Sequence, residues 1–541
     1  MNPRNLRTVN SDMKLQDEDK TPDWAIDINC HLEEGHTFDA GKSWTIYRVP
    51  NNFHQVRESA FDPKIISVGP FHCKESSLQA MEEHKMRYLV RLLGGKFEKE
   101  GGSGLDGEEL PRKTVKLEDL VKSMKLLEQK TRACYSENFN NIKSDEFVHM
   151  MVTDGCFVVE ILRQYYKHVK HEEAKLKDLD SRSKKGIAAI IETVDDPSRQ
   201  KKTVDDPIFE TRWMLRTLQR DLLMLENQLP FFVLEELFKL TSTDQEETSL
   251  PVLAVTFFNP LLPREDIAAK LDKEEEYDHL LDVFRSTFLS AVRKKVKAHG
   301  WSGSSHNLSM PAIASQDRNL ILDVFLTTFL SAVQACTRRG THGSFSSSHS
   351  SASQDRQLNH CAIEVQEAGV EIQKQENCDL LDISYNDGVL KIPPLPINDD
   401  TVPLFFNFIA FEQCDDAARP FFTNFFMFLD SLIYSKLDVQ ILHREAIINH
   451  ALGSNKAVAI LINTLARQIV YDPSQCYLSA EMKKVNHRCK VYYESKLRTW
   501  WRNLVRKYFS NPWSILSLAA AILLLILTVV QTFYTIYPVY K

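Results

Sequence analysis

Residues Asp145 to Lys167, with the sequence DEFVHMMVTDGCFVVEILRQYYK, decide the fold class of this 541-residue chain. Their apolar side chains recur at the three- and four-residue spacing of an amphipathic α-helix. Two further stretches, Leu117 to Ser136 and Pro207 to Leu240, show the same long pattern. Three helices of this length predict a mainly α-helical protein with a large helical domain.

A fourth helix is predicted from Leu78 to Leu93, with Ser76 or Ser77 as its N-terminal cap and Gly94 at its end. Two apolar runs, 404–411 and 421–433, are too short to span a membrane and are expected to form the densest part of the core. The residues predicted to share the buried face of the fourth helix are Met81, Lys85, Tyr88, Leu89 and Leu92.

A small β element is predicted after residue 360. Residues Ala368 to Ile372, Leu380 to Tyr385 and Val389 to Ile392 alternate as strands do. The last two flank Asn386-Asp387-Gly388, a signal for a tight β-hairpin. Short extended pieces, each ended by a proline, are expected at 46–50 and 65–70.

Polar residues interrupt the apolar pattern in the stretch from Pro207 to Leu240. Glu226, Asn227 and Gln228 follow a run of leucines and stand just before Pro230. Such a group is typical of a helix kink or end, where side chains satisfy backbone groups.

An internal repeat precedes the β element. The segment from Leu281 to Val292 recurs about 41 residues later as Leu322 to Val333, and each copy predicts a packed amphipathic helix. The Ser-, Gly- and His-rich tracts behind the copies, 300–316 and 340–354, are expected to be flexible. The predicted buried residues are Leu281, Phe284, Phe288 and Val292 in the first copy and Leu322, Phe325, Phe329 and Val333 in the second.

The C-terminal segment from Trp513 to Tyr537 is predicted to be a transmembrane helix. Residues Ser510 to Tyr540 contain no charged side chain. At about 1.5 Å per residue the segment would cover roughly 37 Å, more than a hydrocarbon core of about 30 Å. A buried core helix is the alternative. Only Pro538 to Lys541 follow, so the segment is interpreted as a tail anchor.

Charges beside this segment predict its orientation. Arg498, Arg502, Arg506 and Lys507 precede it, and Lys541 follows it. Because basic residues are enriched on the cytosolic side, we expect a single-pass protein with a cytosolic N-terminal domain. The plasma membrane is the candidate membrane. The polar, charged first twenty residues contain no secretory signal.

Composition and charge exclude several classes of function. The chain is 43% hydrophobic and 26% charged with a net charge of −7, which is typical of a globular protein. This near-balanced charge disfavours nucleic-acid binding. Ten cysteines without a C-x-x-C pair predict thiols of a reducing compartment. No cofactor or metal is expected; the disfavoured metal candidates are His72 with Cys73, His360 with Cys361, and His487 with Cys489.

The sequence contains no motif of a known catalytic or nucleotide-binding site. Gly102, Gly104 and Gly107 match G-x-G-x-x-G, but they follow a charged segment instead of a strand, so they are interpreted as a loop. G-x-S-x-G, Walker A and H-E-x-x-H patterns are absent. We therefore predict no catalytic residue.

From Ile46 almost to its end, the chain resembles the plant domain of unknown function 247 family, also called uncharacterised protein family 0481. The motifs keep the order found in that family, although Phe61 and Cys73 depart from it. The matching stretches are Ile46-Tyr-Arg-Val-Pro50, Val68-Gly-Pro70, Met81-Glu82 with Lys85, Asp154-Gly-Cys-Phe157, Leu225-Glu-Asn-Gln-Leu-Pro230, Glu367-Ala-Gly-Val370, Gly388-Val-Leu-Lys-Ile-Pro393, Ala410-Phe-Glu412, Asp438-Val439, Leu452-Gly-Ser454, Asn511-Pro-Trp513 and Ala519-Ala-Ala521 leading to Gln531-Thr532.

The resemblance implies a largely helical domain anchored by one C-terminal transmembrane helix, with no established chemistry. Some members are associated with pollen-side recognition in grass self-incompatibility, so the resemblance makes a recognition role one expectation. Family likeness alone does not transfer that role.

Three classes of function remain open. We favour a membrane-tethered interaction or recognition protein that binds an unidentified protein partner. The second class is an enzyme whose unrecognised site is assembled from distant residues such as His72, Asp154 and Glu226. The third is a membrane-organising or trafficking component.

The predicted organisation has four parts. A disordered arm covers 1–40, and the mainly helical family domain covers 41–509. Within that domain, 297–360 hold the duplicated helix and its flexible insert. The transmembrane helix covers 513–537.

Overall fold

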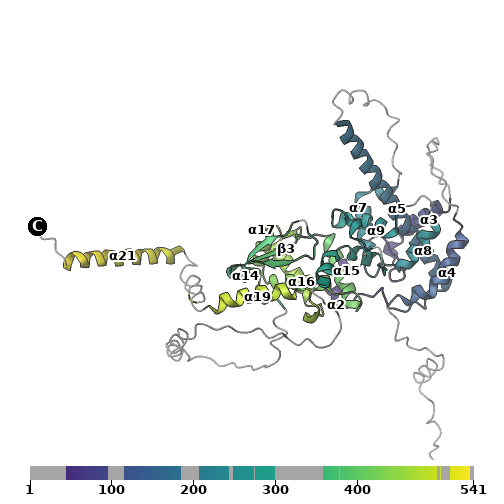
Figure 1. The fold of residues 1–541 in the computed structure, drawn as a ribbon. Coiled ribbons are helices and arrows are strands. Elements are labelled where there is room, and N and C mark those ends of the chain that lie inside the picture. The colour runs from purple at the N-terminus through teal and green to yellow at the C-terminus, as the bar shows by residue number, and fades with distance from the viewer. Residues whose placement is uncertain are drawn as a thin grey trace, which may run out of the picture.

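A computed structural model describes residues 44–94, 115–183, 206–242, 248–272, 275–298, 357–376, 378–495, 500 and 512–536. Most described residues are helical and a few form short strands (Figure 1), so the predicted mainly α class is confirmed. The predicted N-terminal arm, the glycines at 102–107 and the second copy of the repeat lie outside the described residues.

The N-terminal half is built around α5 (Ser144–Ser183), which begins one residue before the predicted start and continues past Lys167. Gly155 lies where α5 meets a neighbouring helix, since a Cβ atom there would come within 2.3 Å of Leu237 Cδ1. The helices packed against α5 are α3 (Ala80–Leu92), α4 (Leu117–Ala133), α8 (Phe231–Thr241) and α9 (Leu250–Phe258).

Both α3 and α4 confirm predicted helices. The five residues expected on the buried face of α3 are all buried, Lys85 included. The predicted serine cap is wrong, because Ser76 and Ser77 lie in the 3-10 helix η2 (Ser76–Leu78) and Gln79 precedes α3 without a side-chain cap. Gly94 ends the segment with a φ of 85°, a left-handed conformation that glycine adopts without strain.

The predicted single helix from Pro207 to Leu240 is wrong. The chain forms α6 (Pro207–Glu210), α7 (Arg212–Asp221) and α8, with an irregular buried turn before Pro230. Proline has no N–H to continue a helix. The interpretation of the polar residues as a helix end is confirmed.

The first copy of the repeat lies in the core. Its four predicted apolar residues, Leu281 to Val292, are all fully buried. The copy is not one helix, because α10 (Leu280–Ser286) ends before α11 (Ser290–Ala298) begins. Other short elements of this half are α2 (Asn51–Val56), η1 (Glu58–Ala60), η6 (Asn259–Leu261) and η7 (Ile267–Lys270).

The C-terminal half contains the two phenylalanine-rich helices expected in the core. Nearly every residue of α15 (Thr401–Cys414) is buried, and α16 (Phe421–Leu432) packs beside it. The remaining elements around them are α14 (Ala362–Glu367), α17 (Lys436–Arg444), α18 (Asn455–Ala466), η8 (Pro473–Gln475) and α19 (Ser479–Glu494).

The β element is small and mixed. The hairpin of β2 (Ser384–Asn386) and β3 (Val389–Ile392) is confirmed, with Asp387 and Gly388 left-handed in its turn. β1 (Glu371–Lys374) pairs parallel to β3. The predictions were too broad at 368–370 and 380–383, which are not strands. A parallel pair, β4 (Leu395–Ile397) with β5 (Ile448–His450), was not predicted. The extended piece at 46–50 contributes an isolated bridge from Ile46 to Tyr135.

A C-terminal helix, α21 (Pro512–Ile536), occupies the residues predicted to span the membrane. Among the residues that the structure describes, however, no helix has the length and apolar character needed to cross a membrane. The predicted transmembrane anchor is therefore not supported by the structure.

Candidate functional site

The end of α7 and the irregular turn between α7 and α8 carry four buried polar side chains. Asp221, Glu226, Asn227 and Gln228 are each at most 1% exposed. Burying such groups is unfavourable unless hydrogen bonds replace the lost water. Asp221, Glu226 and Asn227 bond to residues 48–68, far away in the sequence, whereas Gln228 bonds mainly within the turn.

Asp221 and Asn227 hold the extended piece at 64–68. Asp221 Oδ2 accepts hydrogen bonds from the backbone N–H groups of Lys64 and Ile65, at 2.9 and 2.8 Å. The Asn227 side chain accepts from the N–H of Val68 at 2.6 Å and donates to the carbonyl of Ile66 at 3.0 Å. Burial raises the pKa of Asp221 to about 6, although these N–H donors oppose that shift.

Gln228 holds the turn itself. Its side-chain amide donates to the backbone carbonyls of Leu222 and Met224, both at 2.8 Å. The backbone carbonyl of Gln228 accepts from the Tyr135 hydroxyl at 3.0 Å. Gly69 packs against the same carbonyl, where a Cβ atom would lie only 2.7 Å from the oxygen. The side chains of Asp221 and Asn227 therefore fix residues 64–68 through hydrogen bonds to their backbone, and the Gln228 carbonyl packs against Gly69.

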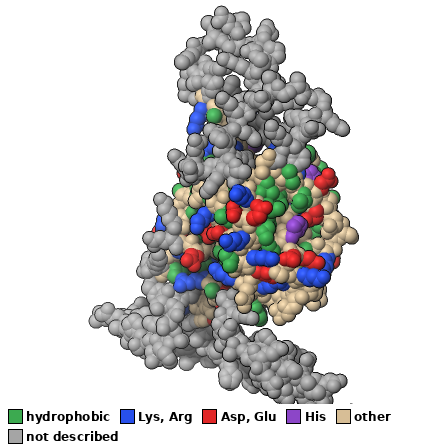
Figure 2. Space-filling view, turned by 90° about the vertical axis from the view of Figure 1, so that its right-hand side faces the viewer, with side chains coloured by type: hydrophobic (Ala, Val, Ile, Leu, Met, Phe, Trp, Pro, Cys, Tyr) green, Lys and Arg blue, Asp and Glu red, His purple; other side chains and the backbone are tan. Residues whose placement is uncertain are grey.

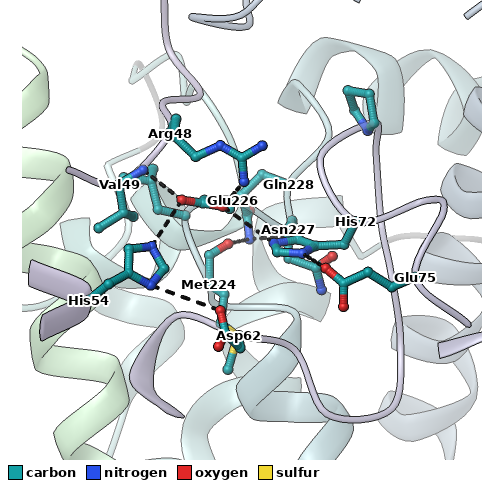
Figure 3. A network of polar contacts seen from close by, with 12 residues as sticks. Arg48, Val49, His54, Asp62, His72, Glu75, Met224, Glu226, Asn227 and Gln228 are labelled. Carbon is teal, nitrogen blue, oxygen red and sulfur yellow. Dashed lines mark hydrogen bonds and ion pairs between the residues drawn. The ribbon is translucent and has the colours of Figure 1, made fainter. Parts of the chain in front are cut away.

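Glu226 lies at the centre of a chain of charged groups (Figure 3). Its carboxylate accepts from the Val49 N–H at 2.7 Å and from Arg48 Nη1 at 2.6 Å. His54 Nε2 approaches it to 3.4 Å and His72 Nε2 to 3.5 Å. The second distance is long for a hydrogen bond, so charge attraction dominates that contact.

Two further carboxylates face the outer nitrogens of these histidines. Glu75 Oε1 lies 2.5 Å from His72 Nδ1, and Asp62 Oδ1 lies 3.9 Å from His54 Nδ1. Carboxylates and imidazoles thus alternate in a chain of contacts, in the order Glu75, His72, Glu226, His54 and Asp62. The two ends of this chain are partly exposed, and Glu226 at its centre is buried. We call Arg48, His54, Asp62, His72, Glu75 and Glu226 the Glu226 cluster.

The electrostatics of the Glu226 cluster favour charged groups at its centre. Burial raises the pKa of Glu226, but the contact with His72, the charge of Arg48 and the Val49 N–H outweigh it, so the pKa is lowered. Burial likewise opposes charge on His72, but the two glutamates beside it raise its pKa. The charged forms of His72 and Glu226 therefore stabilise each other.

A second buried group lies beside the first. Lys85 Nζ, on α3, donates to Asp154 Oδ1 on α5 at 2.7 Å and to the carbonyl of Ser67 at 2.6 Å. Asp154 Oδ2 also accepts from the N–H of Gly69 at 3.0 Å. The three residues named for a hypothetical enzyme site are thus divided: His72 contacts Glu226, and Asp154 pairs with Lys85.

The arrangement can hold and exchange protons, but its central groups, Glu226 and His72, are buried. Two surface hollows of the described chain lie elsewhere, one lined by residues of α4 and one by residues of α14 and α17. The described residues contain no group of three His, Cys, Asp or Glu suited to a metal ion. Of the disfavoured metal pairs, His72 lies in the Glu226 cluster, and His360 contacts Glu364 at 3.1 Å.

The sequence points to Glu226 and His72 but not to the other four members of the Glu226 cluster. Arg48 falls in a predicted proline-ended extended piece, and no pattern marks His54, Asp62 or Glu75. No spacing connects them with Glu226, because Arg48 lies 178 positions away in the sequence. An isolated histidine and aspartate near the start of a domain carry no pattern that would have identified them.

Comparisons with known proteins place the chain in a plant family. It is 27% identical to UPF0481 protein At3g47200 of Arabidopsis thaliana, over 91% of this chain and 86% of that protein. It is 21% identical to Putative UPF0481 protein At3g02645 of the same plant, over 94% of each. No solved structure matches the chain. The family DUF247, described as "Plant protein of unknown function", matches residues 46–527. The chain belongs to this family.

Proposed function

We propose that this protein is an interaction or recognition module that binds a protein partner through α4. The observation that carries the proposal is an exposed apolar surface on a well-packed helix. Leu117 is 43% exposed and Leu126 is 79% exposed, although Leu120 and Met124 of the same helix are fully buried. We call Leu117, Val121, Lys122, Lys125 and Leu126 the α4 surface.

Figure 2 shows the end of the molecule that carries α4, where hydrophobic side chains gather among acidic and basic ones. A shallow hollow on this end is lined by the α4 surface together with Glu118. Exposed apolar side chains with a charged rim are typical of sites that bind other proteins.

The charges of the α4 surface indicate the chemistry of the partner. Its hollow contains Lys122 and Lys125 against one acidic residue, Glu118. Lys125 also lies 3.3 Å from Asp145, but both side chains are largely exposed, so this ion pair is weak. The partner that fits is a protein segment with apolar side chains flanked by carboxylates.

An interaction role is favoured over an enzyme centred on the Glu226 cluster. Glu226 is 1% exposed and His72 is 5% exposed. A substrate would have to displace the hydrogen bonds that hold residues 48–72 to the turn. The burial of Glu226 and His72, together with the hydrogen bonds that Glu226 accepts from Arg48 and the Val49 N–H, supports a structural role for the Glu226 cluster.

The α4 surface is tested by Leu126→Glu, with Leu437→Glu as the matched control. Leu437 is 50% exposed on α17, in the other half of the molecule. Proximity labelling in plant cells should show a recurrent partner that is lost with Leu126→Glu and kept with Leu437→Glu. Reconstituted binding of that partner should weaken with rising salt. An unchanged set of partners in the Leu126→Glu protein would contradict the proposal.

We also propose that α21 attaches the protein to a membrane, with the large domain in the cytosol. What supports this is a run of exposed apolar side chains, including Leu523 at 59%, Leu525 at 66% and Val529 at 60%. Exposed apolar surface of this extent is unfavourable in water and favourable in lipid. Cell fractionation of the full chain and of a chain ending at residue 509 tests it. Only the full chain should pellet with membranes.

A further inference from the structure

The first copy of the repeat fills a deep slot in the core. The side chains of Phe284 and Phe288 are fully buried. Phe284 packs against the ring of Phe258 at 5.8 Å, and Phe288 packs against Phe408 and Phe422 at 5.7 and 5.6 Å. We call the space that α10 and α11 occupy, against α9, α15 and α16, the repeat slot.

The second copy carries the same apolar side chains as the occupant of this slot. Between Leu281 and Val292, the copies differ only at Arg285, which corresponds to Leu326, and at Ser286, which corresponds to Thr327. Every large apolar side chain that fills the repeat slot within this segment is therefore present twice in the chain. A five-residue motif behind each copy is repeated as well, since Ala-Ser-Gln-Asp-Arg occurs at 314–318 and at 352–356.

Polar contacts distinguish the two copies. Arg285 donates to Glu412 Oε1 from Nε at 3.0 Å and from Nη2 at 2.7 Å, and it also donates to the carbonyl of Arg419. Leu326 cannot make these bonds. His279, which caps α10 through a 3.2 Å bond from the N–H of Asp282, corresponds to Leu320 in the second copy. The first copy is thus the stronger occupant.

The length of the chain permits an exchange of the copies. With the second copy in the slot, residues 272–318 would form the connection on one side and residues 340–357 the connection on the other. The shorter connection, at about 3.3 Å per residue, reaches roughly 55 Å, more than twice a radius of gyration of about 23 Å for such a domain. Loop-closure entropy changes little with length, so the longer connection adds only a small cost.

From these observations we infer that the repeat slot is a binding site for the second copy, residues 319–339 of the same chain. The second copy is a reserve occupant that takes the slot when the first copy leaves it. Loss of the Arg285–Glu412 pair makes the exchanged form less stable than the form described above. The inference is independent of the proposed binding at α4.

Matched aspartates in the two copies test the inference. Phe284→Asp places a carboxylate against Phe258 and Phe408, which is strongly unfavourable in the core. Phe325→Asp makes the same change in the second copy. Thermal unfolding of the full-length chain in detergent, followed by far-ultraviolet circular dichroism of its helices, reports whether a cooperative transition remains.

The expected results separate a reserve occupant from an idle duplicate. Phe325→Asp should leave Tm unchanged, and the double variant should lose the cooperative transition. Phe284→Asp alone should keep a transition with a Tm lowered by roughly 10 °C. Adding Leu326→Arg to Phe284→Asp should raise that Tm, because the new guanidinium can reach Glu412 from the second copy.

Two outcomes would overturn the inference. In the first, Phe284→Asp, with and without Leu326→Arg, behaves as the double variant does. In the second, Phe284→Asp keeps a transition only as a dimer whose Tm rises with protein concentration. The occupant would then come from another chain rather than from the same one.

Discussion

Glu226 and Glu412 are buried to the same extent but neutralised in different ways. Their side chains are 1% and 0% exposed. Glu226 faces two histidines and an arginine that is 42% exposed, within a cluster whose outer carboxylates reach solvent. Glu412 faces Arg285, which is 4% exposed, and accepts from the N–H groups of Phe422 and Thr423 at 3.0 and 2.8 Å.

The difference lies in which partners can lose their charge. A guanidinium stays protonated at any ordinary pH, whereas an imidazole titrates near neutrality. The Glu412 pair is therefore a permanent part of the core, and it also selects the first copy of the repeat. The Glu226 cluster joins residues 48–72 to the turn before Pro230, and because the contact with Glu226 raises the pKa of His72 we expect its strength to depend on pH.

The largest expected effect is the removal of the permanent cation. Arg285→Leu, which copies the residue of the second repeat, leaves Glu412 buried with only its backbone donors. Breaking a buried ion pair in this way costs about 3–5 kcal/mol of unfolding free energy. Urea denaturation of the full-length protein measures the loss.

The matched control for this prediction removes the stranded charge. Arg285→Leu combined with Glu412→Gln should regain part of the lost stability, since it removes the buried charge while the glutamine carbonyl still accepts one of the two bonds that Phe422 and Thr423 donate to separate carboxylate oxygens. If the double variant is no more stable than Arg285→Leu, lost packing of the arginine stem explains the effect, and the unpaired charge does not.

A smaller loss is expected at the open cluster. Glu226→Gln removes the charge that Arg48 and His72 face and turns an amide N–H toward one of the donors. A hydrogen bond to a charged group contributes about 1.5–3 kcal/mol, so we expect a loss of about 2 kcal/mol at pH 7. Arg48 is partly exposed and can be rehydrated, which is why the loss should be smaller than for Arg285→Leu. A larger loss at Glu226 would invert the comparison.

The pH dependence sharpens the comparison further. The pKa of His72 is raised in the folded protein above its ordinary value of about 6.5. Its contribution to stability is therefore complete below pH 6.5 and is lost as pH rises through the folded pKa. Between pH 6.5 and 8.5, the unfolding free energy should fall more steeply in the wild type than in His72→Gln.

Arg285→Leu provides the control for this pH dependence. Its stability should be lower than that of the wild type at every pH, but its slope between pH 6.5 and 8.5 should be unchanged. The total change with pH should be smaller than the loss caused by Glu226→Gln. Equal slopes in the wild type and in His72→Gln would show that the Glu226 cluster does not act through His72.

The two regions also differ in how far the sequence predicts them. The core around Glu412 lies in α15, whose apolar run indicates burial without any knowledge of the partner helix. The Glu226 cluster depends on contacts between residues more than 150 positions apart, which no local periodicity encodes. The polar residues before Pro230 predict a buried helix end, but they do not predict which segment satisfies it.

Other errors have similar physical causes. The pair of β4 with β5 joins segments about 50 residues apart, and Pro396 disfavours the first of them as a strand. The prediction of a single helix from Pro207 to Leu240 continues the helical spacing through Asn227 and Gln228. The side chains of these residues bond to backbone groups and so compete with the helix. Helices with a continuous apolar face, such as α3, α4 and α5, were located to within three residues at their N-terminal ends.

The smallest expected effect is at the solvent end of the Glu226 cluster. Glu75 is 44% exposed, so Glu75→Gln should lower the unfolding free energy by less than about 0.5 kcal/mol. Its effect on the charge of His72 should still be measurable, because Glu75 is one of the two carboxylates that raise the pKa of this imidazole. We expect a lower His72 pKa in NMR titration of the ring protons. Glu364→Gln, which removes a similarly exposed carboxylate beside His360, should leave that pKa unchanged. If Glu75→Gln also leaves it unchanged, the buried Glu226 alone sets the charge of His72, and the solvent end has no part in the pH response.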